Sequence, residues 1–228
     1  DLAAVARRVL DAAPRPTLLV NNAGIALAGR FDQMTLEEFD EVMAVNFRAP
    51  VALTHALLPA LVAQPGSHVV NVSSLFGLIA PPGQTAYCAS KFALRGFSEA
   101  LRLELLDQGV GVTTVHPGGV RTRIAEQARV ASGVPREEAE AGKRSFGRFL
   151  THPADRAAER ILRGVERREA RVLVALSAKV PDVLARLFPV GWTRLVPRAA
   201  RRRPVGATAT LGRATPGPAT RGSATLGR

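Results

Sequence analysis

Short apolar runs and longer amphipathic stretches alternate along most of the chain. The apolar runs are rich in β-branched residues and bounded by glycine, proline or polar residues, which is typical of buried strands. They lie at residues 17–20, 69–72, 110–115 and 171–176. Between them, apolar positions recur every three or four residues, which predicts helices. This alternation predicts an α/β fold with a doubly wound parallel sheet of the Rossmann type.

The helices expected from this pattern fill most of the sequence between the strands. Residues 35–62 predict one long helix, because Thr35 and Glu38 have the spacing of a capping box. Pro50 should kink that helix. Further helices are expected at residues 3–13, 85–107 and 151–168.

Two later segments have a less definite pattern. Residues 124–150 are expected to be helical, polar and punctuated by glycine, with apolar residues such as Phe146 and Phe149 among many charges. Residues 181–197 are apolar with scattered arginines. They fit three roles: a roof over a substrate pocket, a dimer interface, or a segment lying on a membrane surface.

Composition narrows the class of protein. A chain of 228 residues that is 46% hydrophobic can bury one sizeable core. Cys88 is the only cysteine, which argues against a disulfide framework or a zinc cluster, so no metal site is expected. Because no run of eighteen uninterrupted apolar residues and no signal-peptide pattern is found, we expect no transmembrane helix and a cytoplasmic location.

The positive charge is concentrated at the end of the chain. The net charge is +12, and residues 198–228 contribute seven arginines and no acid. This segment is Ala/Thr/Gly/Pro-rich and is expected to be disordered, leaving residues 1–197 as the folded domain. A basic tail can bind nucleic acid or acidic lipid non-specifically. Without aromatics to stack bases, a solvated tail with no specific nucleic-acid partner is the favoured interpretation.

Ser74, Tyr87 and Lys91 are the clearest candidates for catalysis. Ser74 follows the strand at residues 69–72, at the carboxyl end where open α/β sheets bind ligands. Tyr87 and Lys91 are four residues apart and therefore share one helical face. A nearby ammonium lowers the pKa of a phenol from about 10, which lets it exchange protons near neutral pH. With a serine holding the substrate oxygen, such a site suits alcohol/carbonyl interconversion by a nicotinamide.

These three residues also have ordinary structural interpretations. A Tyr-x-x-x-Lys pair on a helix is common by chance, and serines often end strands. Composition favours catalysis, because Tyr87 is the only tyrosine and lysine occurs only at positions 91, 143 and 179. In a chain that otherwise uses arginine, a lysine marks a place where a compact ammonium is needed.

The stretch Val69 to Lys91 resembles the active-site segment of the short-chain dehydrogenase/reductase family. That family has a strand ending in serine, followed thirteen residues later by Tyr-x-Ala-Ser-Lys, and here Ser74 precedes Tyr87-Cys88-Ala89-Ser90-Lys91. The resemblance covers about residues 1–197. It implies an oxidoreductase with NAD or NADP as cofactor, the preference not being readable. It also implies that Tyr87 is the general acid/base and contacts both substrate and cofactor. Lys91 would lower the pKa of Tyr87 and hold the cofactor ribose, and Ser74 would bind the substrate oxygen.

Two further motifs precede this segment. Asn22, Ala23 and Gly24 follow the strand at residues 17–20 and taken alone are typical turn residues. The resemblance implies that they border the cofactor. Asn46 taken alone is a polar helix position before a kink. The resemblance implies that it holds a water that links Lys91 to solvent.

One motif follows the active-site segment. His116-Pro117-Gly118-Gly119-Val120-Arg121-Thr122 taken alone is a loop with two glycines, and His116 is expected to be structural. In the similar family segment, the chain wraps the nicotinamide. The resemblance therefore implies cofactor contacts from Pro117, Gly118, Val120 and Thr122, with the Val120 backbone and the Thr122 hydroxyl foremost.

The first part of the family's pattern has no counterpart in this sequence. Residues 24–29 lack the Gly-x-Gly-x-x-Gly spacing of a phosphate loop. If residues 17–20 are the family's fourth strand, two βα units of about 30 residues each are absent. We therefore expect an N-terminally truncated domain, whose incomplete sheet lacks the first strands and the glycine-rich loop and exposes an edge.

Two functions from different classes fit these observations. The first is an oxidoreductase that interconverts a small-molecule alcohol and carbonyl compound with NAD(P). The resemblance implies a substrate lid at residues 124–150, and the apolar residues there favour a hydrophobic substrate. By resemblance it would form a homo-oligomer through the helices at residues 35–62 and 85–107. The alternative is an inactive, truncated remnant that binds lipid or nucleic acid through its C-terminal helix and basic tail.

Overall fold

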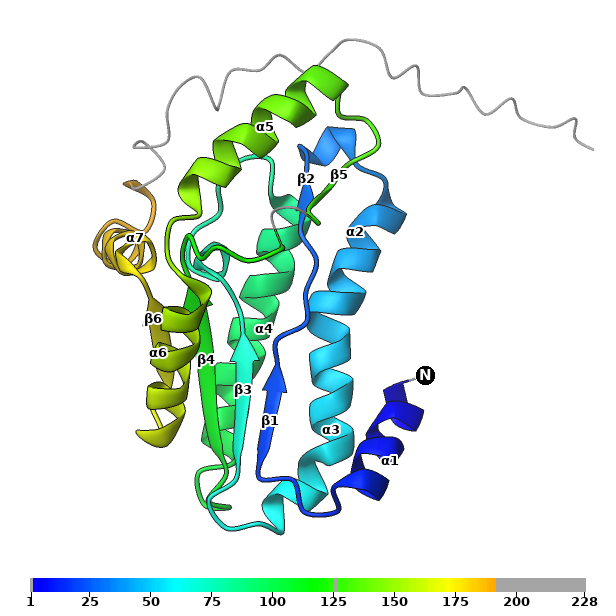
Figure 1. The fold of residues 1–228 in the computed structure, drawn as a ribbon, viewed down its shortest axis with the longest axis vertical. Coiled ribbons are helices and arrows are strands. Elements are labelled where there is room, and N and C mark those ends of the chain that lie inside the picture. The colour runs from blue at the N-terminus through cyan, green and yellow to red at the C-terminus, as the bar shows by residue number, and fades with distance from the viewer. Residues whose placement is uncertain (1, 125–126, 192–228) are drawn as a thin grey trace, which may run out of the picture.

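Four parallel strands form the central sheet of the computed structural model, which describes residues 2–124 and 127–191 (Figure 1). The expected tail at 198–228 and the boundary at residue 197 lie outside the described residues. The strands lie in the order β1 (Leu18–Asn21), β3 (His68–Val72), β4 (Gly111–Pro117) and β6 (Arg171–Val174). The predicted α/β fold with a parallel sheet is confirmed. As expected, β1 is at an edge, with Leu18 43% and Val20 48% exposed.

One face of the sheet is covered by α1 (Leu2–Ala12), α3 (Ala49–Val62) and α4 (Thr85–Glu104). Val69 and Val112, which pair across β3 and β4, point into this layer. Leu61 and Leu101 pack against them. Successive strand residues face opposite ways, so the neighbouring Val70 points to the other face.

The opposite face is covered by α6 (Ala154–Glu166). Val70, Val115 and Val172 form a second core with Ala157 of this helix. All three valines are fully buried. The strands are continuous β-branched runs because both faces of the sheet are covered by helices, which is typical of parallel sheets.

The predicted helix at residues 35–62 is interrupted before its proline. It consists of α2 (Leu36–Met43), a π-helical turn η2 (Ala44–Arg48) and α3. Thr35 caps α2 as predicted, accepting a bond from the Glu38 amide. Pro50 is the second residue of α3 and follows this turn directly, so the irregularity expected at the proline takes the form of a π turn just before it.

Residues 124–150 differ from the predicted helical segment. Only α5 (Arg136–Phe149) is helical, and the chain before it forms the short strand β5 (Arg129–Val130), paired with β2 (Leu27–Ala28). A third small core that includes Leu27, Val42 and Ala131 supports this pair. Because β2 and β5 are a hundred residues apart in sequence, local periodicity could not reveal their pairing. In Figure 1, α5 lies across the carboxyl ends of the sheet strands.

The short helices η1 (Phe31–Gln33) and η3 (Leu75–Gly77) and the final helix α7 (Leu176–Leu187) complete the described chain. α7 exposes an apolar stripe made of Leu176, Val180, Val183 and Leu187, each more than half exposed. None of the described residues after 180 lines the large cavity, so the roof interpretation of residues 181–197 is wrong for residues 181–191.

Sequence analysis expected no transmembrane helix. In the structure, the continuous helical stretch Leu36–Val62 is long and apolar enough to cross a membrane by length and composition alone. Its mean hydropathy is 1.3. Core helices of proteins outside membranes reach the same length and hydropathy, so these two properties do not make it a membrane span.

Candidate functional site

A cavity of about 680 Å³ opens at the carboxyl ends of β1, β3 and β4. Its floor is made by the residues that follow these strands, and α5 closes it from above. The predicted site residues on its lining are Asn22, Ala23, Gly24, Ser74, Tyr87, Lys91, Pro117, Gly118, Val120 and Thr122. The structure thus brings together, around one cavity, ten of the eleven side chains singled out from sequence; Asn46 lies behind the lining.

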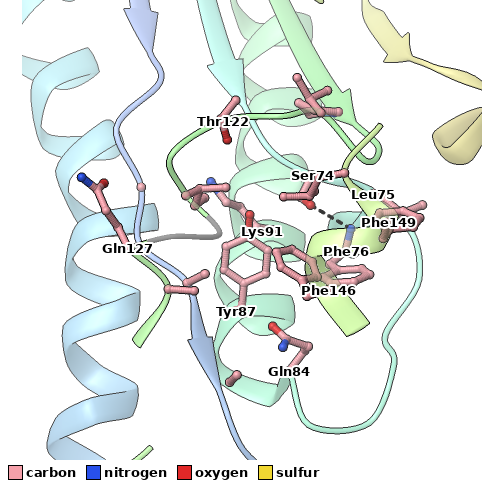
Figure 2. A pocket seen from close by; sticks show the side chains of 18 of the residues that line it. Ser74, Leu75, Phe76, Gln84, Tyr87, Lys91, Thr122, Gln127, Phe146 and Phe149 are labelled. Carbon is pink, nitrogen blue, oxygen red and sulfur yellow. Dashed lines mark hydrogen bonds between the residues drawn. The ribbon is translucent and has the colours of Figure 1, made fainter. Parts of the chain in front are cut away.

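Ser74, Tyr87 and Lys91 come from two adjacent elements (Figure 2). Ser74 is the N-cap of η3, and its Oγ accepts a bond from the Phe76 amide at 3.1 Å. Tyr87 and Lys91 lie one turn apart on α4, with Lys91 Nζ 5.6 Å from the centre of the Tyr87 ring. Both side chains are buried, at 8% and 3% exposure.

A close approach of η3 to α4 sets this geometry. Ser73 Oγ donates to the Lys91 carbonyl at 2.9 Å, which ties the end of β3 to α4. A Cβ on Gly77 would lie 2.9 Å from that same carbonyl and would also collide with Ser73 Oγ. Only glycine lets the loop pack this tightly, so Gly77 helps to hold Ser74 beside Tyr87.

Burial dominates the electrostatics of the pair on α4. It raises the pKa of Tyr87 to about 12, although the adjacent Ser74 hydroxyl acts to lower that pKa. It also lowers the pKa of Lys91 to about 8. Burial is the largest influence on the Tyr87 pKa, and it acts against the lowering that sequence analysis expects from Lys91, whose Nζ lies 5.6 Å from the ring centre.

A backbone carbonyl fixes the position of the Lys91 ammonium. Its Nζ donates to the Val72 carbonyl at 3.0 Å, at the end of β3. A Cβ on Gly24 would lie 3.3 Å from the same nitrogen. Lys91 is therefore held between β3 and the loop after β1, at the bottom of the cavity.

Asn46 acts on the loop after β1. Its Oδ1 accepts from the Ile25 amide at 2.8 Å, and its Nδ2 donates to the Ile25 carbonyl at 2.9 Å and to Ser90 Oγ at 3.0 Å. The π turn of η2 directs this fully buried side chain toward residues 24–25; such turns often occur at functional sites. Both Nδ2 hydrogens and one lone pair of Oδ1 thus join three segments of the protein.

The first asparagine of the Asn-Asn-Ala-Gly motif was missed by sequence analysis. Asn21 Nδ2 donates to Asn71 Oδ1 at 2.8 Å and to Thr54 Oγ1 at 3.1 Å, joining β1 to β3 and α3. Asn22 and Ala23, in contrast, are exposed at the cavity. Alternation along a strand gives the signal that could have found it, since Asn21 ends β1 on its buried side.

The loop after β4 is shaped by two glycines. A Cβ on Gly118 would lie 2.9 Å from the Ala178 amide nitrogen, and one on Gly119 would meet the Phe149 backbone. The Gly119 amide donates to Ser177 Oγ at 3.0 Å. Val120 is buried and Thr122 is exposed, and both line the cavity.

His116 is structural, as expected, but it supports the site. Its Nδ1 lies 2.9 Å from the Ser74 carbonyl, and because a carbonyl only accepts, Nδ1 carries the hydrogen. Burial lowers the pKa of His116 to about 4, so the ring is neutral at pH 7. The ring thus fixes the backbone of Ser74 from behind.

The structure adds aromatic residues to the cavity that sequence patterns did not mark. Phe76, Phe146 and Phe149 line it together with Tyr87. Within residues 2–124 and 127–191, no group of three or more His, Cys, Asp or Glu side chains is placed to hold a metal ion. The candidate chemistry therefore lies with the hydroxyls of Ser74 and Tyr87 and the Lys91 ammonium.

Comparison with known proteins agrees with this site. Residues 1–132 match the model of the short chain dehydrogenase family. Over 179 residues, the chain is 47% identical to a putative oxidoreductase, SadH, of Mycobacterium tuberculosis, covering 77% of this chain and 64% of that protein. The chain therefore spans somewhat less than two thirds of that relative's length.

Solved structures show the same fold. A short-chain dehydrogenase/reductase from Burkholderia phymatum in complex with NAD has a TM-score of 0.74 at 25% identity, with 82% of this chain and 70% of that chain covered. A short-chain dehydrogenase from Sphingobium yanoikuyae in complex with NADPH has a TM-score of 0.64 at 29% identity, with 92% and 74% covered. The family match, the fold and the arrangement of Ser74, Tyr87 and Lys91 around one cavity agree: this chain belongs to the short-chain dehydrogenase/reductase family.

Proposed function

We propose that the protein is an oxidoreductase that interconverts an alcohol and a carbonyl compound with a nicotinamide dinucleotide. The observation that carries this proposal is the convergence of Ser74, Tyr87 and Lys91 on one cavity at the carboxyl end of the sheet. Ligands of open α/β sheets bind at that end. The alternative, an inactive remnant that binds lipid or nucleic acid through its C-terminal helix and basic tail, leaves the convergence of Ser74, Tyr87 and Lys91 on one cavity without a role.

The three side chains divide the work at the substrate oxygen. Ser74 Oγ donates a hydrogen bond to that oxygen, while Tyr87 gives it a proton in the reductive direction and takes one in the oxidative direction. With a pKa of about 12, Tyr87 is protonated at neutral pH and is ready to donate. The Lys91 ammonium, with a pKa of about 8, is charged at neutral pH and stabilises negative charge that develops on the phenol.

The lining residues fit a bound nicotinamide. Gly24 and Gly118 line the cavity, and a Cβ on Gly118 would collide with Ser177 Oγ, so the loop after β4 presents backbone to a ligand at this point. Asn22, Ala23 and the segment Pro117–Thr122 would hold the dinucleotide, and Lys91 would hold its ribose. When bound, the cofactor supplies or accepts the hydride. Relatives of this fold have been solved with NAD and with NADPH, so we propose one of these two cofactors.

Asn46 is proposed as a positioning residue. Its bonds to Ile25 and Ser90 hold the loop after β1 against α4, which keeps Gly24 beside Lys91. The second lone pair of Asn46 Oδ1 would accept a hydrogen bond from a water that links Lys91 to solvent.

We further propose that residues 1–197 form one domain, that residues 198–228 form a separate tail, and that two copies associate through α2–α3 and α4. Exposed apolar side chains support the association: Leu36 is 67%, Leu103 60% and Leu106 58% exposed. Size-exclusion chromatography of Leu103→Glu tests this interface, and an unchanged elution volume would contradict it.

The location proposed is the cytoplasm, with α7 in contact with a membrane surface. Its exposed stripe, Leu176, Val180, Val183 and Leu187, is followed in sequence by residues 194–203, which hold five arginines and no acid. An apolar helix face next to clustered cations favours anionic lipid. Co-sedimentation with anionic vesicles should be lost in Val183→Gln, and binding equal to that of the native chain would contradict this location.

Titration of NADH and NADPH, followed by nicotinamide fluorescence, tests the proposed function directly. Binding of one of them, weakened by Thr122→Val but unchanged by the exposed control Thr35→Val, is expected. Absence of binding by both dinucleotides would contradict the proposal. Oxidation of the bound cofactor on addition of a carbonyl compound would complete the test.

A further inference from the structure

One side of the cavity is an aromatic wall, which we define as Phe76, Phe146 and Phe149 (Figure 2). Phe76 meets Tyr87 edge to face, with ring centres 6.1 Å apart. Phe146 and Phe149 stack with centres 6.5 Å apart and planes at 28°. Three of the nine phenylalanines of the chain therefore line the cavity together with its only tyrosine. This concentrates ring surface at the place where a substrate must reach Ser74.

The polar side chains near β2 contact one another. Arg30 pairs with Asp32 at 3.1 Å and lies 3.8 Å from Glu138 at the start of α5. Gln33 Nε2 donates to Glu138 Oε2 at 3.3 Å. These contacts link η1 to α5, so hydrogen bonds and ion pairs within the chain close this end of the cavity.

Two cations on the lining, Arg123 and Lys143, are exposed to water. A charged substrate would pair with them only in a solvated, screened setting. The less exposed part of the lining offers the Ser74 and Tyr87 hydroxyls beside the Lys91 ammonium. Gln33 is already bonded to Glu138 and Ser73 to the Lys91 carbonyl, and much of the remaining surface is apolar, including Leu75, Val120 and Ile161. The cavity thus fits a ligand with one oxygen function and an apolar body.

We propose that the substrate is a ketone or aldehyde, or the corresponding alcohol, whose reacting carbon is attached directly to an aromatic ring. This inference rests on the proposed function, because Ser74 and Tyr87 must hold the oxygen. The short distance from Tyr87 to Phe76 brings the aromatic wall within reach of a ring on the reacting carbon. Aromatic rings 4.5–7 Å apart attract each other beyond the burial of their area. A saturated ring of equal size would gain only the burial.

The test compares an aryl ketone with its saturated counterpart. Binding of 2-acetylnaphthalene is followed by its own fluorescence, and acetyldecalin and a straight-chain methyl ketone of equal carbon number compete for the site. We expect the aryl ketone to bind about tenfold more tightly than acetyldecalin. Equal affinity of the two would overturn the inference.

Substitutions in the aromatic wall show which rings cause the preference for the aryl ketone. Phe146→Leu keeps an apolar side chain but removes the ring, and should reduce the preference for the aryl ketone about three- to tenfold, the range of a single aromatic pair. Phe76→Leu should do the same from the other side of the wall. Phe92→Leu is the control, since Phe92 is 39% exposed on α4 and does not line the cavity. A preference that survives in both wall variants would overturn the inference.

Turnover separates this inference from the proposed function. If the aryl ketone binds with the expected preference but NADH and NADPH are not oxidised, the oxidoreductase proposal fails and the ring site stands. If acetyldecalin is reduced with the same kcat/KM as the aryl ketone, the ring inference fails and the oxidoreductase proposal stands.

Discussion

The two walls of the cavity are built in different ways. The inner wall, made of β3, η3 and α4, is deeply packed: within α4, Tyr87, Lys91 and Leu94 are all buried. The outer wall, α5, has no buried residue along its length. Figure 1 shows α4 against the sheet and α5 spanning its end.

The two walls therefore suit different tasks: the packed inner wall suits the reaction, and the less packed outer wall suits substrate recognition. Ser74, Tyr87 and Lys91 must keep a fixed geometry, and they lie where backbone bonds and core packing fix them. Phe146 and Phe149 lie on a helix held at its ends, by Glu138 near η1 and by Phe149 against Gly119. The inner wall should therefore determine the rate of the reaction, and the outer wall, together with Phe76 of η3, the choice of substrate.

The largest expected effect is on the inner wall, in Lys91→Met. This variant keeps an unbranched side chain but removes the ammonium that stabilises the phenolate, so kcat should fall about 100-fold or more. In the native protein, kcat/KM for carbonyl reduction should decline above about pH 8, as Lys91 loses its proton. Steady-state kinetics from pH 6 to 10 measure both, with the exposed Lys179→Met as control. A kcat that is unchanged in Lys91→Met would show that the Lys91 ammonium takes no part in the reaction.

A pair of truncations compares how firmly the walls are packed. Leu94→Ala opens a cavity in the core and should lower the free energy of unfolding by about 2–5 kcal/mol. Phe146→Ala should lower it by less than about 1 kcal/mol, because α5 buries little. Urea unfolding followed by circular dichroism measures the two values. Equal losses would mean that the walls do not differ in packing.

A smaller effect is expected for the bonds that join the loop after β1 to the inner wall. Asn46→Leu leaves the Ile25 backbone groups and Ser90 without their partner, and should cost about 1–3 kcal/mol. Asn22→Leu, at an exposed position of the same loop, should cost about 0.5 kcal/mol or less. The same urea titration compares them. A larger loss in Asn22→Leu would show that the Asn46 bonds do not hold the loop.

A further effect, which depends on pH, is expected from two buried histidines, His68 on β3 and His116 on β4. Burial lowers the pKa of both His68 and His116 to about 4, whereas an unfolded chain has histidines near 6.5. The unfolded state therefore binds more protons between these values, and the free energy of unfolding should fall as the pH drops from 6.5 to 4.

Variants assign this acid sensitivity to the buried rings. His68→Gln and His116→Gln should each flatten the fall in the free energy of unfolding, while the exposed His55→Gln should leave it unchanged. Unfolding titrations at pH 7.0, 5.5 and 4.5 measure the slope. An equal slope in the native protein and in the double variant His68→Gln/His116→Gln would rule out these rings as its source.

The inner wall could largely be predicted from the sequence. Val69, Val70 and Val115 are β-branched and buried on both faces, so local pattern and tertiary structure agree. Ser74, Tyr87 and Lys91 were found because their spacing depends only on one strand, one loop and one helix. The pKa of Tyr87 was not predictable, because it depends on burial by residues from other elements.

The outer wall could not be predicted in the same way. The β2–β5 pair is two residues long on each side and joins distant segments, so no periodicity marks it. Phe146 and Phe149 were recognised as apolar anchors, but their stacking and their approach to Tyr87 depend on where α5 crosses the sheet end. Asn21 was missed because its role depends on Asn71 in the neighbouring strand.

The central claim is that the Tyr87 hydroxyl transfers the proton at the substrate oxygen. Tyr87→Phe removes only that hydroxyl from a buried ring, so the fold and the affinity for NADH or NADPH should not change. The account predicts that kcat of Tyr87→Phe, measured with the dinucleotide and carbonyl compound that the native chain uses, falls about 100- to 10,000-fold. A kcat within a few-fold of the native value would contradict it.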